Sequence, residues 1–279
     1  MRDFRPRGGA AILAAAAALL AGTARADTGT VIRANNYFGI GAGVTHLGYG
    51  ETLAGQPGYL DTENGNLPTV KFELGSMRDA LGVSNLYEHI ELSYANGQTT
   101  YNGAVTNLLT GASFPVTNQS DAEILAGRVA LGKGFVLAEG LMLTPHLDLG
   151  GRYWRRNLNG GDPPGYEELY SHWFYGAGLK ADYSPVPRLT LSVDGAVRRN
   201  FESRMEASIE EDPFKLGNRG NYFLSGRVDY RLPGGVSLFA ETALERFKYG
   251  RSSVHASGFF EPDSSTNQIT YLGGVAFGF

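Results

Sequence analysis

Apolar and polar side chains alternate along several parts of the chain. From residue 141 onwards the odd positions are mainly leucine and the even positions mainly polar or charged, as in Leu147-Asp148-Leu149. A period of two places successive side chains on opposite faces of a β-strand. Ten segments follow this period, at about 37–49, 68–79, 86–101, 121–133, 141–156, 169–183, 189–198, 222–231, 236–249 and 269–279. The pattern therefore predicts ten strands, each with one apolar face and one polar or small face.

The connections between these segments alternate in length. Short ones, rich in Gly, Pro or Ser, lie near 80–85, 134–140, 184–188 and 232–235, and much longer ones lie near 50–67, 102–120, 157–168, 204–218 and 250–266. A soluble β-sandwich has no reason to sort its loops in this way, whereas a transmembrane barrel has short turns at one rim and long loops at the other. We therefore predict an all-β, antiparallel up-and-down transmembrane barrel of ten strands, with eight as the alternative.

The first 26 residues have the pattern of a secretory signal peptide. Three arginines in residues 1–7 precede an apolar run at 10–20, and Ala24-Arg25-Ala26 supplies the small residues of a cleavage site. The uncharged stretch at 8–22 is shorter than the ~20 residues that a transmembrane helix needs. We expect a Sec-type signal peptide at 1–26, cleavage before Asp27, and a single barrel domain over 27–279.

Composition excludes several other classes. The chain has no cysteine, so it can form neither a disulfide framework nor a thiolate metal site. Glycine, at 39 of 279 residues, is about twice its usual frequency of roughly 7%. A net charge of −4 does not indicate the basic surface that a nucleic-acid-binding protein needs. No long apolar stretch follows residue 27, so an exported chain of this kind can enter a membrane only as a closed barrel.

The C-terminal segment keeps the two-residue period to an aromatic last residue. Together with the signal peptide and the strand pattern over 37–279, this tail resembles the outer-membrane β-barrel superfamily of Gram-negative bacteria, in the size range of its OmpA-like, opacity-type and omptin barrels. The resemblance implies the cell outer membrane, contact with its lipids and lipopolysaccharide, and recognition by the barrel assembly machinery. The residues that match this assembly signal are Tyr271, Val275, Phe277 and Phe279.

Aromatic residues near the strand ends are expected to form girdles at the two membrane interfaces. The expected girdle residues are Tyr37, Phe38, Tyr94, Tyr153, Tyr183, Tyr230, Tyr249 and Tyr271.

The polar faces of the predicted strands carry eight basic and eight acidic side chains. A ten-stranded barrel is only slightly wider than the eight-stranded size that side chains fill, and a buried lone charge is costly. We therefore predict a narrow lumen plugged by ion pairs. The residues assigned to this lumen charge network are Asp148, Arg152, Lys180, Asp182, Asp194, Arg198, Arg227 and Asp229.

The omptins, barrels of this size, act as surface proteases through acidic residues and a histidine at the extracellular rim. Comparable side chains in the predicted long loops do not match the omptin motifs, and Ser253 with His255 matches the lipid A deacylases only weakly. We therefore predict no catalytic, cofactor or metal site, and a structural or surface-interaction role for the loops, with an unknown host or surface partner. A narrow channel is the main alternative and a hydrolase a weaker one. The comparable rim residues are Asp61, Glu63, Glu210, Glu211, Asp212 and His255.

Overall fold

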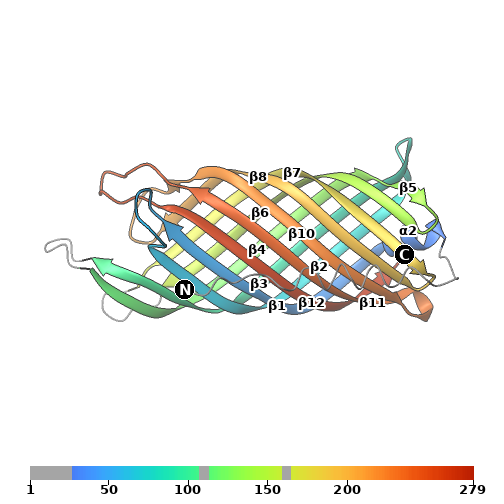
Figure 1. The fold of residues 1–279 in the computed structure, drawn as a ribbon, viewed down its shortest axis with the longest axis horizontal. Coiled ribbons are helices and arrows are strands. Elements are labelled where there is room, and N and C mark those ends of the chain that lie inside the picture. Colours follow the sequence, from blue (N-terminus) through green and yellow to red (C-terminus); the bar gives the residue numbers. More distant parts are fainter. Residues whose placement is uncertain (1–26, 107–112, 159–164) are drawn as a thin grey trace.

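Ten long strands form one closed antiparallel sheet in the computed structural model, which describes residues 27–106, 113–158 and 165–279. The predicted signal peptide lies outside the described residues. Each long strand pairs with the next along the chain, and β12 pairs with β1 to close the barrel (Figure 1). The strands are β1 (Tyr37–Thr52), β2 (Asp61–Ala80), β3 (Val83–Thr106), β4 (Ser113–Lys133), β6 (Leu141–Leu158), β7 (Glu167–Val186), β8 (Leu189–Ala207), β10 (Gly217–Arg231), β11 (Val236–Gly250) and β12 (Asp263–Gly278). The prediction of a ten-stranded up-and-down barrel is confirmed.

Two further strands are short. β5 (Phe135–Ala138) pairs with the start of β6, and β9 (Phe214–Lys215) pairs with the end of β8. β5 lies within a connection that we expected to be a simple turn.

The two faces of the sheet differ as the alternation predicts. Leu147 and Leu149 are 67% and 53% exposed on the outside, whereas Asp148 between them is buried inside the barrel. The exposed side chains of this outer face form an apolar belt, as in a barrel whose outer face meets lipid. The belt includes Ile40, Val70, Phe72, Ile90, Leu92, Val129, Leu131, Val193, Val197, Leu224 and Val228.

Most of the expected girdle residues lie on the outer face, but two do not. Tyr37 and Tyr249 point into the barrel, where Tyr249 is fully buried and Tyr37 contacts His89. The prediction that they belong to the girdle was wrong, because both occupy strand positions whose side chains point into the barrel. The girdle residues found exposed are Phe38, Tyr94, Tyr153, Tyr230 and Tyr271.

The strands are longer than a bilayer requires. They contain 15 to 24 residues, whereas about 9–11 suffice to cross the hydrocarbon. The extra length lies at the end with the long connections, where outward residues such as Asn66, Gln98 and Arg155 are polar or charged. The predicted loops at 50–67, 102–120, 157–168 and 204–218 were therefore too long, and Asp61 and Glu63 belong to β2.

A short helix that the sequence did not predict lies at the opposite end, with the short connections (Figure 1). In barrels of this type the end with the short turns is the periplasmic end. α2 (Thr28–Ala34) begins after Asp27, whose carboxylate accepts a hydrogen bond from the Thr30 backbone N–H at 2.8 Å. Val31 of this helix is fully buried among side chains that line the barrel. No helix among the described residues is long and apolar enough to cross a membrane. The side chains packed with Val31 are Met77, Tyr87, Ala130 and Met142.

Candidate functional site

The middle of the lumen contains a cluster of ion pairs centred on Asp148. Its carboxylate accepts hydrogen bonds from Arg128 on β4 at 3.1 Å and from Arg198 on β8 at 2.7 Å. Arg128 also donates to Asp194 at 2.8 Å, and His146 lies within 3.0 Å of both carboxylates. These contacts tie β4, β6 and β8 together across the inner face of the barrel.

Arg152 does not pair with Asp148, although the two lie four residues apart on the same face of β6. Its guanidinium instead forms an ion pair with Glu245 on β11. Arg198 also lies 3.6 Å from Glu245, so this carboxylate bridges two arginines. The alternation correctly predicted that these side chains point inward. Their partners depend on the curvature of the closed sheet, which a linear pattern does not contain.

A second group of charges lies towards α2. Lys180 forms an ion pair with Asp182, and both bond to Asn35, which follows α2. Arg227 pairs with Asp229 on its own strand at 2.8 Å and, on β2, with Glu73. All eight residues assigned to the lumen charge network lie on the inner face. They are distributed over two groups rather than along one ladder.

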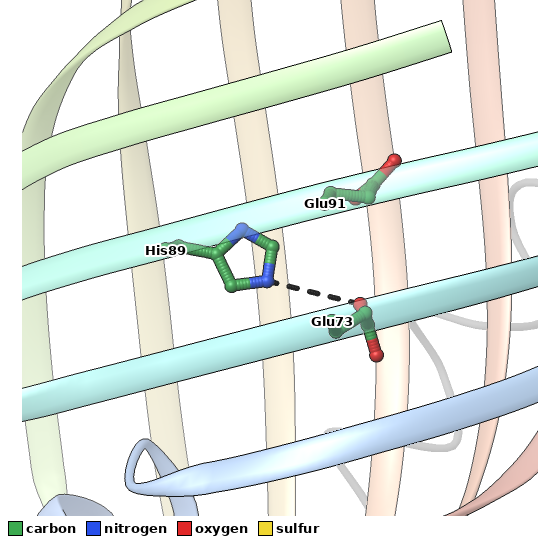
Figure 2. A group of neighbouring side chains, drawn as sticks. All are labelled: Glu73, His89 and Glu91. Carbon is green, nitrogen blue, oxygen red and sulfur yellow. Dashed lines mark ion pairs between the residues drawn. The ribbon is translucent and has the colours of Figure 1, made fainter. Parts of the chain in front are cut away.

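Glu73, His89 and Glu91 form a compact group on neighbouring strands β2 and β3 (Figure 2). The two glutamates are directly opposite in the strand register, and His89 Nε2 lies 3.8 Å from Glu73. Three such ligands could hold a metal ion. However, the Lys71 ammonium already lies 2.8 Å from Glu73 and 4.0 Å from Glu91. We therefore assign the group to the ion-pair network.

A cavity lies within the lumen. Its wall includes Lys71, Glu91, Arg152, Arg198 and Glu245. Two guanidinium nitrogens of Arg152 and one of Arg198 have no hydrogen-bond partner among the described protein atoms. A cavity lined by charged groups with free donors is suited to holding water.

An aromatic layer lies extracellular to this cavity. The rings of Trp154 and Tyr170 stack with their centroids 5.3 Å apart. The ring of Tyr249 also stacks on that of Tyr170, at 5.6 Å between centroids. Tyr49 meets Trp154 edge-on at 5.2 Å. Because these buried rings come from β1, β6, β7 and β11, they fill the barrel from several sides.

A cluster of acidic side chains, here called the acidic chamber, surrounds Arg156 at the extracellular end. Arg156 is almost fully buried and contacts Glu63 at 2.7 Å and Glu168 at 2.6 Å. Glu51 lies 3.9 Å from the same guanidinium. The chamber lies above the membrane belt, because the outward neighbours of Arg156 and Glu168 are Arg155 and Glu167. Its residues are Glu51, Asp61, Glu63, Glu168 and Glu261 with Arg156.

Several chamber carboxyls hold protons more tightly than usual. Burial, together with the nearby Glu168 carboxylate, raises the pKa of Glu261 to about 8. Burial likewise raises the pKa of Asp61 to about 6 and that of Glu51 well above its ordinary value. The partner of Glu261 is the Tyr170 hydroxyl, which donates at 2.5 Å, and that of Glu51 is the Tyr49 hydroxyl at 2.6 Å.

Most of this chamber was not predicted from the sequence. Asp61 and Glu63 were placed in a loop, and Glu51, Glu168 and Glu261 were assigned no role. Extending the inward parity of Leu67 and Thr69 along β2 would have placed Glu63 inside. Glu261 offers no such signal, because it lies in the connection between β11 and β12.

Of the other predicted rim residues, Glu210 and His255 contact each other, with 3.5 Å between the Glu210 carboxylate and His255 Nδ1. The His255 ring stacks on Phe214 at 4.1 Å. Ser253 lies in the same loop as His255, between β11 and β12.

No family model matches the chain, and no curated protein matches it in sequence. Solved structures do match its fold. The outer-membrane protease OmpT from Escherichia coli aligns with a TM-score of 0.57 at 10% identity, over 88% of this chain and 97% of OmpT. The transport unit of the Escherichia coli autotransporter AIDA-I aligns at 0.42 and 10% identity, over 86% and 90% of the two chains. Ail of Yersinia pestis aligns at 0.29 and 12% identity, over 87% and 99%.

The OmpT alignment covers nearly all of both chains, and at 10% identity it concerns the fold alone. It agrees with the closed sheet of ten long strands and with the apolar belt on the outer face. This chain therefore has the fold of an outer-membrane β-barrel, a closed antiparallel sheet of ten long strands.

Proposed function

We propose that the protein is a non-catalytic barrel with a closed lumen, which acts through its extracellular end in a structural or surface-interaction role. The observation that carries this proposal is the Asp148 cluster, where Arg128 and Arg198 reach the same carboxylate from two different strands. An ion that crosses the lumen would have to separate these groups, and a buried charge that loses its partner is costly.

Two other layers support a closed lumen. On the periplasmic side α2 inserts Val31 into the barrel, and Asn35 bonds to Asp182. On the extracellular side the stacked rings of Tyr170 and Trp154 lie across the interior. A permeant ion would thus meet three successive obstacles.

A narrow channel is the second candidate, and the lumen cavity favours it. Charged groups such as Glu91 and Arg152 line this cavity, so it can hold water in the middle of the barrel. Conduction would require openings through both the aromatic layer and the α2 end. This alternative therefore demands movement of buried side chains.

Single-channel recording of the refolded protein in planar bilayers tests the proposal. We expect no discrete conductance steps from the unaltered protein. Arg198→Ala, which removes one partner of Asp148, should admit ions more readily than Arg199→Ala, which changes an outward-facing neighbour. Regular conductance steps from the unaltered protein would contradict a closed lumen and favour the channel.

The absence of catalysis has a separate test. Incubating the refolded protein with a mixed peptide library should give no cleavage. Cleavage that Glu210→Gln abolishes would instead favour a hydrolase, because Glu210 contacts the His255 imidazole.

A further inference from the structure

The connection between β11 and β12, residues 251–262, carries one acid into the acidic chamber. Glu261 is only 5% exposed, and its carboxylate accepts a hydrogen bond from Tyr170 on β7. Two hydrogen bonds at the base of the loop fix this placement, both at 2.9 Å. The Ser252 N–H donates to the Glu261 carbonyl, and the Glu261 N–H donates to the Ser252 hydroxyl. A change in the charge of Glu261 therefore acts at the base of this loop.

The groups around Glu261 compensate only part of a negative charge there. Arg156 is the basic group of the chamber, and it is already bonded to Glu63 and Glu168. An oxygen of Asp61 is buried without a hydrogen-bond partner among the described atoms. The titratable groups that face Glu261 are Tyr49 and Glu51 on β1, Asp61 on β2, Arg156 on β6, Glu168 and Tyr170 on β7, and Tyr249 on β11.

We propose that residues 251–262 form a proton-held latch, which closes over the acidic chamber when Glu261 is neutral and is released when Glu261 ionises. In the closed state a neutral Glu261 can remain buried beside the Tyr170 hydroxyl. An ionised Glu261 would be a buried carboxylate next to other acids and without a basic partner of its own, so it would favour a state in which it reaches water. The latch is independent of the proposed function.

The direction of the pH dependence follows from burial. The pKa of Glu261 is raised to about 8 in the closed state, and an exposed glutamate titrates near 4.5. Closure is therefore fully favoured below about pH 4.5, weakens as the pH rises, and is lost as the pH passes through about 8. Asp61, with a pKa raised to about 6, adds repulsion within the same window.

A spin label reports the state of the latch. The chain has no cysteine, so Val254→Cys, at an exposed position in the loop, gives a single attachment site. We expect the label in the full refolded protein to be restrained at low pH and mobile at high pH, with a midpoint near 8. A label at Gln56→Cys, in a connection without acidic residues, is the matched control and should show no such transition.

Two variants separate the latch from other titrations. Glu261→Gln should keep the label restrained at every pH, and Tyr170→Phe should move the midpoint upwards, because the hydroxyl stabilises the ionised form. His255→Asn should leave the transition in place. The other charged groups that touch the loop are Glu210, at His255, and Asp263, which contacts both Arg219 and the backbone of Arg251.

A heat-modifiable band on a gel establishes that each variant is folded. If the unaltered protein shows no mobility transition at residue 254, the latch is wrong. It is equally wrong if the transition survives Glu261→Gln, and its loss with His255→Asn would assign it to His255 instead. Should Glu261→Gln fail to fold, an unmoved midpoint in Tyr170→Phe would overturn the proposal.

Discussion

The lumen within the bilayer and the acidic chamber above it lie on the same inner face of the barrel, but they balance charge differently. In the lumen Asp148 touches two arginines, and Glu245 also lies within 4.0 Å of two. In the chamber five acids share Arg156, and Glu261 relies on a tyrosine hydroxyl. The lumen network is therefore redundant, whereas the chamber depends on one basic residue and on protons.

Removing Arg156 should have the largest effect. Arg156→Met leaves Glu63 and Glu168 without a cation in a buried site, which should lower the unfolding free energy by about 3–5 kcal/mol near neutral pH. Denaturant unfolding of the refolded protein in detergent measures this loss. Arg155→Met is the matched control, because its partly exposed side chain forms surface ion pairs worth about 1 kcal/mol or less. Equal losses in the two variants would contradict the special position of Arg156.

An arginine on the lipid-facing surface should have the next largest effect. Leu149→Arg should cost about 2–4 kcal/mol in lipid vesicles if the residue lies near the midplane, because the charge meets hydrocarbon. Leu169 also points outward, but it lies above the apolar belt beside charged outer residues. Leu169→Arg should therefore cost about 1 kcal/mol or less. If both substitutions cost the same, the boundary between lumen and chamber is misplaced.

Removing one arginine from the redundant lumen network should cost less than removing Arg156. Arg198→Met leaves Asp148 bonded to Arg128 and Glu245 bonded to Arg152, so we expect a loss of about 1–3 kcal/mol. Arg199→Met, on the outward face, is the control for the loss of a long side chain. A loss as large as that of Arg156→Met would mean that the lumen has no redundancy.

The aromatic tail should matter for assembly rather than for stability. Phe279 follows the last strand and is 74% exposed, so Phe279→Ser should leave the unfolding free energy of refolded protein unchanged. In cells the same variant should reduce the heat-modifiable folded form in the outer membrane. An unchanged cellular yield would remove Phe279 from the assembly signal, which also includes Tyr271, Val275 and Phe277.

The sequence predicted the strands and their parity inside the bilayer, because lipid outside and ion pairs inside impose opposite chemistry on alternate residues. The positions of Leu149 and Asp148 follow from this contrast. Above the bilayer both faces meet water or polar groups, so the contrast fades. Glu63 and Glu168 were consequently assigned to loops. α2 is only seven residues long, too short to give a clear helical period.

In the acidic chamber buried carboxyl groups are protonated at neutral pH, whereas in the lumen the carboxylates are ionised and paired with basic side chains. Infrared spectroscopy of the refolded protein measures this directly, because a protonated carboxyl group absorbs apart from a carboxylate. At neutral pH we expect a protonated carboxyl band that Glu261→Gln diminishes and that a shift above about pH 9 removes. The absence of that band at neutral pH, or its persistence unchanged in Glu261→Gln, would contradict the account.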